Sequence, residues 1–152
     1  MRLVVQRVRH ASVVVDGEKV AAIAQGLLLL VGIASGDADV DLHRAARKVV
    51  DLRIFEDDAG KMNRSVREVG GQILAVSQFT LYGDTRKGRR PSFAGAASPE
   101  VAEPLFDAFV GALRDERLDV QTGKFGAKMA VELLNDGPVT LLIEVAPASS
   151  VG

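Results

Sequence analysis

An apolar run of nine residues, "GLLLLVGIA" at positions 26–34, constrains the fold of this chain more than any other feature. Successive side chains of a β-strand point to opposite faces of the sheet, so a wholly apolar strand needs cover on both faces. The run is far shorter than the roughly 20 residues that a bilayer-spanning helix needs. It therefore predicts a central strand that is buried on both sides.

Further strands are predicted on both sides of this run. The segments "LVVQRV" and "ASVVVDGEKVAAI" are rich in β-branched residues, and Asp16-Gly17 is typical of a two-residue hairpin turn. Shorter β-like segments follow at "LRIFED", "QILAVSQFTLYG", "LDVQTG" and "GPVTLLIEV". Most of the chain is therefore expected to form sheet.

Two helices are predicted from apolar residues at helical spacing. The first follows the polar segment "SGDAD", and its apolar positions are Leu42, Ala45, Ala46 and Val49. The second starts at Ser98 with Pro99 in its first turn, and its apolar positions are Ala102, Leu105, Phe106, Phe109 and Leu113. Pro104 lies inside this helix, so we expect an irregular first turn.

These elements predict an α/β fold of the α+β-like kind, in which largely antiparallel β-sheet forms a barrel-like or layered core with two main helices packed on it. A length of 152 residues and a hydrophobic fraction of 47% suit one domain, over residues 1–147, with a flexible tail at 148–152. No apolar leader segment follows Met1, so we expect a cytoplasmic protein that does not bind membranes.

The composition excludes several kinds of site. The chain has no cysteine, which removes disulfides, thiolate zinc sites and cysteine nucleophiles and suits a reducing compartment. The phosphate-loop, dinucleotide-binding, zinc-protease and serine-hydrolase motifs are absent. Neither His10 nor His43 has a neighbouring serine and acid that would indicate a catalytic triad. We expect no metal and no cofactor.

Three polar segments remain as candidates for chemistry. In "SQFTLYGD" (77–84) a strand ends in polar groups, which either bind an oxyanion through backbone donors or merely satisfy loop carbonyls. In "RKGRR" (86–90) a dense basic run either contacts phosphates or is simply solvated. In "NDGPVT" (135–140) a glycine and a proline lie back to back where a strand should begin, which is either an ordinary turn or a functional element.

Taken in order, these segments resemble the D-aminoacyl-tRNA deacylase family. The resemblance rests on "RVRHASVVVDGE", "KMNRSV", "SQFTLYGDTRKGRRPSF", "FGAKM" and "NDGPVT", and it extends to about residue 147. It implies a homodimer with active sites at the subunit interface. It also implies hydrolysis of the ester between a D-amino acid and the terminal ribose of tRNA.

The resemblance also implies the roles of individual residues. The catalytic strand end would consist of Ser77, Gln78, Phe79 and Thr80. The pair Gly137-Pro138, joined by a cis peptide bond and held by Arg7, would reach in from the partner subunit to select the D-enantiomer. The substrate pocket would be lined by Phe125, Gly126, Ala127, Met129 and Asn135. Contacts to tRNA phosphates would come from Arg86, Lys87, Arg89 and Arg90.

A selection element made of backbone suits this task, because it rejects every L side chain by collision without identifying any of them. Glycine permits the close approach, and a cis X-Pro bond supplies stiffness. Since glycine has no side chain to collide, glycyl-tRNA should also be cleaved. For the chemistry, we expect backbone N–H groups around Gln78 and Phe79 to bind the oxyanion. The water is activated either by Thr80 or, as the family implies, by the ribose 2′-hydroxyl.

Two rival functions remain open from the sequence. One is a non-catalytic module that binds tRNA or another RNA through residues 86–90. The other is a small-molecule hydrolase built on Ser77 or Thr80, although no base is evident beside either hydroxyl.

Overall fold

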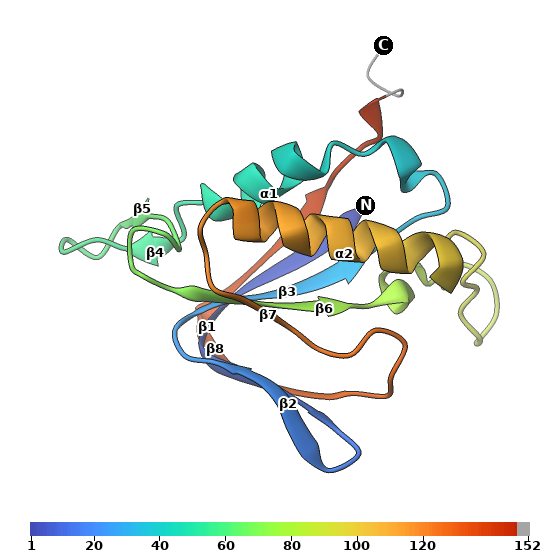
Figure 1. The fold of residues 1–152 in the computed structure, drawn as a ribbon, viewed down its shortest axis with the longest axis horizontal. Coiled ribbons are helices and arrows are strands. Elements are labelled where there is room, and N and C mark those ends of the chain that lie inside the picture. Colours follow the sequence, from blue (N-terminus) through green and yellow to red (C-terminus); the bar gives the residue numbers. More distant parts are fainter. Residues whose placement is uncertain (149–152) are drawn as a thin grey trace.

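The computed structural model describes residues 1–148 of the chain (Figure 1). The long strands are β1 (Arg2–Val15), β2 (Glu18–Ile23), β3 (Gly26–Gly32), β6 (Gln72–Ser77) and β8 (Ala130–Glu144). The short strands are β4 (Phe55–Glu56), β5 (Met62–Arg64) and β7 (Val120–Thr122). The helices are α1 (Leu42–Val50) and α2 (Pro99–Asp115), with 3-10 turns η1 (Asp37–Asp39) and η2 (Phe79–Tyr82). Within residues 1–148, no helix is long and apolar enough to cross a membrane.

The apolar run at 26–34 forms β3, and this central strand is buried on both faces as predicted. Leu27, Leu29 and Val31 face a core that the two helices cover, whereas Leu28 belongs to a second core on the opposite face. The alternation of a strand therefore explains why polar residues are missing from the run.

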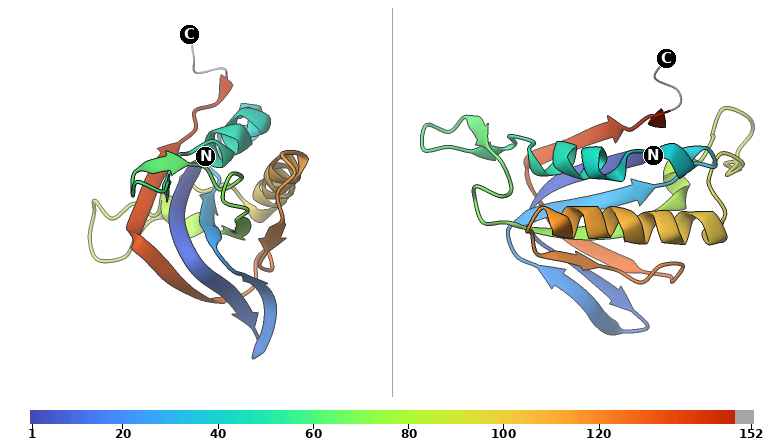
Figure 2. Two further views of the ribbon diagram at one scale, coloured as in Figure 1. Left: turned by 90° about the vertical axis from the view of Figure 1, so that its left-hand side faces the viewer. Right: turned by 45° about the horizontal axis from the view of Figure 1, so that its top comes forward.

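A single six-stranded sheet curls into an incomplete barrel (Figures 1 and 2). Its strand order is β2-β1-β3-β6-β7, and β8 pairs with β1 along most of its length. The pairs β3–β6 and β6–β7 are parallel, and the remaining pairs in this sheet are antiparallel. The predicted largely antiparallel, barrel-like core with two packed helices is confirmed.

Glutamine side chains connect the two ends of this curled sheet. The N–H of Ala22 on β2 donates to Gln121 Oε1 on β7 over 2.9 Å, and the N–H of Ala24 donates to Gln72 Oε1 over 2.8 Å. These amides satisfy N–H groups at a sheet edge that no further strand covers.

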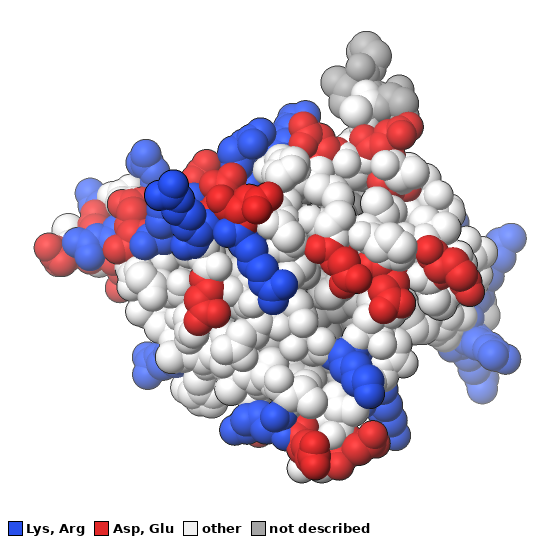
Figure 3. All heavy atoms as spheres, viewed as in Figure 1, with Lys and Arg blue, Asp and Glu red and all other residues white. Residues whose placement is uncertain are grey.

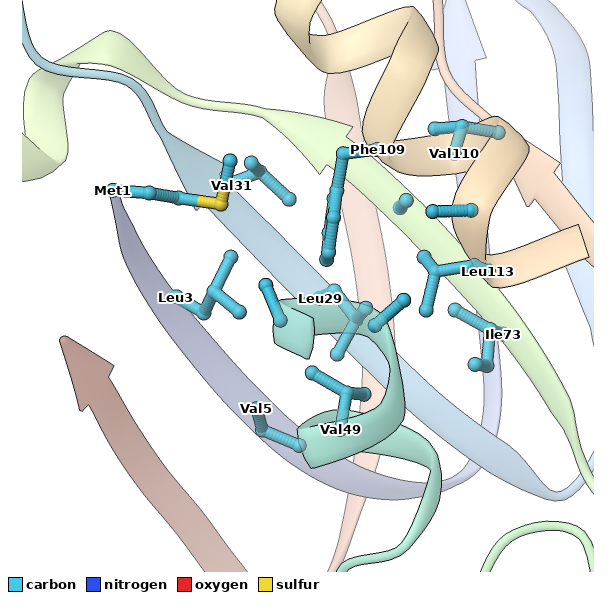
Figure 4. Packing of buried hydrophobic residues seen from close by; sticks show 14 of the residues in the cluster. Met1, Leu3, Val5, Leu29, Val31, Val49, Ile73, Phe109, Val110 and Leu113 are labelled. Atoms are coloured by element: carbon cyan, nitrogen blue, oxygen red, sulfur yellow. The ribbon is translucent and has the colours of Figure 1, made fainter. Parts of the chain in front are cut away.

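Helices α1 and α2 pack side by side on one face of the sheet (Figures 1 and 2). Phe109 of α2 lies against Leu29 and Val31 of β3, and Val49 of α1 faces the same core (Figure 4). The expected start of α2 is present, because Pro99 opens this helix, whereas α1 is capped by Asp41, which the sequence had not singled out. Pro104 lies inside α2, which nevertheless runs unbroken to Asp115.

The last strand differs from its prediction. It was expected to begin at the Gly-Pro pair, but β8 already begins at Ala130 and contains that pair. The register against β1 jumps from Gln6–Thr140 to Val8–Asn135, so residues 136–139 bulge opposite Arg7 alone. A bulge accommodates a proline without N–H inside a paired strand, which the local pattern did not indicate. Of the predicted tail, residues 149–152 lie outside the described part of the chain.

Candidate active site

A pocket of about 480 Å³ opens where β6 ends and η2 begins. Ser77 is the last residue of β6, Gln78 precedes η2, and Phe79 and Thr80 form its first turn. The other predicted residues that line this pocket are Phe125, Gly126, Ala127 and Met129. Eight of the expected site residues, from two separate segments of the chain, thus line one pocket.

Several lining residues were not predicted from the sequence. They are Ile33, Phe93, Ala96, Ala97, Pro99 and Ala102. Phe93 packs edge-on against Phe79, with ring centroids 5.1 Å apart. The only feature of the sequence that indicated a role for Phe93 was its position at the end of "RRPSF", directly after the basic run. The alanines and Pro99 reach the pocket because α2 begins beside the end of β6, which only the three-dimensional packing reveals.

Hydrogen bonds at the strand end decide which groups face the pocket. The N–H of Gln78 donates to the carbonyl of Val31 over 2.8 Å, so the expectation that it binds an oxyanion is wrong. This N–H extends the ladder between β6 and β3 by one residue. The N–H groups of Phe79 and Thr80 open a 3-10 turn, where the geometry supplies no partner within the helix. Of the two N–H groups expected to bind the oxyanion, that of Phe79 therefore remains as the candidate donor.

Thr80 has an amide for a neighbour, not a base. Gln78 Nε2 donates to Thr80 Oγ1 over 3.0 Å, so the threonine oxygen accepts a proton donor. The lining residues, all within 1–148, include no ionisable side chain. His10 lies exposed on β1 and His43 lies exposed on α1, and neither belongs to the pocket. Among the same residues, no cluster of three or more His, Cys, Asp or Glu is placed to hold a metal ion.

The Gly-Pro segment, residues 135–140, is fixed by two polar side chains. Arg7, with 5% of its surface exposed, donates from Nε to the carbonyl of Asp136 over 3.0 Å. Asn135 Oδ1 accepts from the N–H of Val139 over 2.8 Å, and its Nδ2 donates to Thr140 Oγ1. The peptide bond between Gly137 and Pro138 is cis, and both residues are exposed. Asn135 therefore lies in this segment and not in the pocket wall where we expected it.

Within one chain, the Gly-Pro segment and the pocket are apart. Across the sheet, Arg7 of β1 pairs with Leu27 of β3, which in turn pairs with Ile73 of β6. Ile73 lies four residues before Ser77 on β6, which corresponds to about 13 Å along the strand. Neither Gly137 nor Pro138 lines the pocket of the described chain.

In the basic loop, residues 86–90, one of the four cationic side chains forms an ion pair within residues 1–148 and the other three do not. The guanidinium of Arg86 donates to both carboxylate oxygens of Asp84, at 2.7 to 3.1 Å, and holds the pKa of that carboxyl below its usual range. Lys87, Arg89 and Arg90 are exposed, and none of them forms an ion pair within residues 1–148. Within the part of the chain that the structure describes, Arg86 is therefore paired with its own neighbour Asp84, unlike the other three basic side chains of this loop.

The family model described as D-Tyr-tRNA(Tyr) deacylase matches residues 4–144. The chain belongs to this family. A relative named D-aminoacyl-tRNA deacylase, from Brevibacillus brevis, is 61% identical over 95% of this chain and 99% of its own. Another of that name, from Halalkalibacterium halodurans, is 58% identical with the same coverage.

Solved structures of similar proteins confirm the deacylase-family fold. One, named c-Myc DNA Unwinding Element Binding Protein, is 44% identical, covers 97% of this chain and all of its own, and has a TM-score of 0.89. A second, described as a probable eukaryotic D-amino acid tRNA deacylase, is 21% identical over 93% of this chain and 97% of its own, with a TM-score of 0.78. At that identity the second likeness concerns the fold alone.

Proposed function

We propose that this chain hydrolyses the ester that joins a D-amino acid to the terminal ribose of tRNA and spares the L-ester. The observation that carries the proposal is the strand end Ser77–Thr80, which opens directly into the 480 Å³ pocket in a member of the deacylase family. The pocket is mainly apolar, with hydroxyl and amide groups at one end, as suits an aminoacyl group attached to a nucleotide.

In this proposal the chain supplies positions more than reactive side chains. A water oxygen adds to the ester carbonyl carbon, and the developing oxyanion accepts a hydrogen bond from the N–H of Phe79. Collapse of the tetrahedral intermediate breaks the bond to the ribose oxygen, which takes up the proton that the attacking water loses and leaves as a hydroxyl. The ribose 2′-hydroxyl orients the water, since no ionisable side chain lines the pocket within residues 1–148.

A second copy of the chain completes the site in the same proposal. Gly137 and Pro138 are exposed and about 13 Å along the sheet from their own pocket, so they act in the pocket of a partner. Apolar residues exposed on β8 support a homodimer: Leu134 is 46%, Leu141 36% and Leu142 73% exposed. Such side chains on a strand face favour burial against another protein surface.

Selection of the D-enantiomer is assigned to the backbone of Gly137-Pro138. Arg7 and Asn135 fix the segment on both sides, which gives it a defined position against an incoming substrate. An L side chain would collide with this backbone whatever its chemical nature, whereas a hydrogen atom in that place would not. The free cations Lys87, Arg89 and Arg90 would contact tRNA phosphates near the pocket.

Hydrolysis of a matched pair of substrates, D- and L-tyrosyl-tRNA, tests the proposal with the wild type and with Gly137→Ala. A Cβ at Gly137 would lie 2.7 Å from Val139 Cγ2 and 3.2 Å from an Arg7 nitrogen, at a φ of 137° that L residues rarely adopt. We expect the wild type to cleave only the D-ester and the variant to lose activity or discrimination. Gly36→Ala is the matched control, because nothing lies within 4 Å of its Cβ position.

The outcomes separate the remaining alternatives. If neither ester is cleaved while tRNA is bound, the non-catalytic RNA-binding module is the correct function. If simple esters are cleaved without RNA and acyl-type inhibitors label Ser77 or Thr80, the small-molecule hydrolase is correct. If Gly137→Ala behaves like the wild type, the backbone of this segment does not select the enantiomer.

A further inference from the structure

A second cleft lies between α1 and the end of β8. Its volume of about 790 Å³ exceeds that of the candidate active site. Its charged lining residues are Arg44, Arg47, Lys48, Asp51, Arg53 and Glu144. Lys and Arg side chains gather over α1 in the space-filling view, with acidic residues interspersed (Figure 3). Four cationic groups thus line one concavity of a chain whose net charge is −1.

The cations of this α1–β8 cleft lack acidic partners. Within residues 1–148, no ion pair involves Arg44, Arg47, Lys48 or Arg53. Glu144 is already occupied, since its carboxylate accepts from Arg2 Nε over 2.6 Å. Asp51 is the only other acidic residue in the lining. The cleft therefore presents an excess of positive charge to any ligand.

Favourable interaction with the carbonyl end of α1 explains the positions of only two of the four cationic residues. Arg47 and Lys48 lie in the last turn of α1, where cations interact favourably with the helix carbonyl end. Arg44 lies near the start of α1, where a cation is not favoured, and Arg53 lies beyond its end. A solvated surface would explain single exposed cations, but it does not explain why all four face one hollow.

The cleft lies on the same lateral row as the catalytic strand end. Ser77 pairs with Val31, Val31 with Leu3, and Leu3 with Ile143 at the cleft. Three strand spacings of about 4.8 Å place Ser77 and Ile143 about 14 Å apart across the sheet. This distance equals about four stacked nucleotide steps of about 3.4 Å.

Arg2 connects the two sites directly. It pairs with Glu144 in the cleft, and its NH1 donates to the carbonyl of Leu81 in η2 over 2.6 Å. Its guanidinium also stacks on the ring of Tyr82, 4.7 Å from the centroid. The surface from the pocket through η2 to the cleft is therefore built from groups in mutual contact.

We infer that the α1–β8 cleft binds the sugar–phosphate backbone of the substrate tRNA, a few nucleotides away from the esterified 3′ end. This inference rests on the proposed function, because it takes tRNA as the substrate. Phosphates match the cleft since they are anionic, closely spaced and present in every tRNA, so contacts to them add affinity without sequence preference.

Binding of deacylated tRNA, measured at salt concentrations from about 50 to about 200 mM, tests the inference. The test variant is Arg44→Gln/Arg53→Gln, which avoids the two cations that serve the helix end. The control is Lys19→Gln/Lys61→Gln, which removes two exposed charges outside the cleft, one at the start of β2 and one in the loop between β4 and β5. For the test variant, we expect the slope of log Kd against log salt to fall by about 2 and affinity to drop by roughly tenfold. The control should retain the wild-type slope.

Three outcomes would overturn the inference: an unchanged slope in the cleft variant, an equal change in the control, or a changed oligomeric mass of the cleft variant. The first two leave the proposed function intact as long as the wild type cleaves D-aminoacyl-tRNA. If the wild type neither binds tRNA nor cleaves the ester, the proposed function itself fails.

Discussion

Arg7 Nε lies 3.0 Å from the backbone carbonyl oxygen of Asp136, directly beside the bulged Gly-Pro segment. The same guanidinium donates from NH1 to the carbonyl of Ile54 over 2.7 Å. One buried cation thus joins β1, the chain before β4 and the segment assigned to enantiomer selection. Its fork of donors serves two carbonyls in different directions, which a lysine ammonium at the end of a flexible chain does not reproduce.

Replacing Arg7 by lysine should lower both stability and selectivity. We expect the free energy of unfolding to fall by about 2 to 4 kcal/mol, because at least one buried carbonyl loses its donor. Urea unfolding measures this loss, and the ratio of D- to L-tyrosyl-tRNA hydrolysis measures selectivity. Arg9→Lys is the control, since Arg9 is 70% exposed and its bridge to Asp136 should contribute less than about 1 kcal/mol. Wild-type stability and selectivity in Arg7→Lys would contradict the assignment.

Removing the hydroxyl of Thr80 should leave most of the activity. Its oxygen accepts from Gln78 Nε2, and no ionisable residue of the described chain lines the pocket to activate it. We therefore expect Thr80→Ala to reduce kcat on D-tyrosyl-tRNA by less than about tenfold, whereas loss of a true nucleophile costs several orders of magnitude. Single-turnover kinetics with the D-ester measures the effect. A decrease of roughly a thousandfold or more with the fold intact would establish Thr80 as the nucleophile.

Tyr82 should titrate at unusually high pH in the folded protein. Burial, helped by the carboxylates of Asp37 and Glu144 and opposed by Arg2, raises its pKa to about 12. An unfolded tyrosine ionises near pH 10, so the folded state binds the proton more tightly. Stability should therefore decrease as pH rises from about 10 through about 12. Tyr82 is the only tyrosine and there is no tryptophan, so the ultraviolet absorbance of tyrosinate reports this residue alone.

The matched variant for this titration is Tyr82→Phe, which keeps the ring that stacks on Arg2 and removes the ionising hydroxyl. Its unfolding free energy should lack the component lost between pH about 10 and about 12. Titration of the native protein near pH 10 instead would show that the ring is open to solvent.

The sequence predicted the elements that depend on local periodicity. The apolar run of β3, the Asp16-Gly17 turn and the start of α2 at Pro99 follow from side-chain alternation and local turn chemistry, which neighbouring residues determine. Phe93 and the alanines at the start of α2 escaped prediction, since their role depends on which ends of β6 and α2 meet. The N–H of Gln78 was misassigned because a sequence does not show which residue makes the last hydrogen bond between two strands.

Glycyl-tRNA should be cleaved by the same pocket. Selection by collision needs a side chain, and the achiral substrate has only hydrogens at its α-carbon. We expect a measurable rate with glycyl-tRNA and none with L-alanyl-tRNA, which differs from it by a single methyl group. The comparison is made at equal enzyme concentration with a no-enzyme control for spontaneous hydrolysis. Complete resistance of glycyl-tRNA at high enzyme concentration would mean that the pocket also requires an attractive contact to a D side chain, for which Phe125 and Met129 are two of the apolar lining residues.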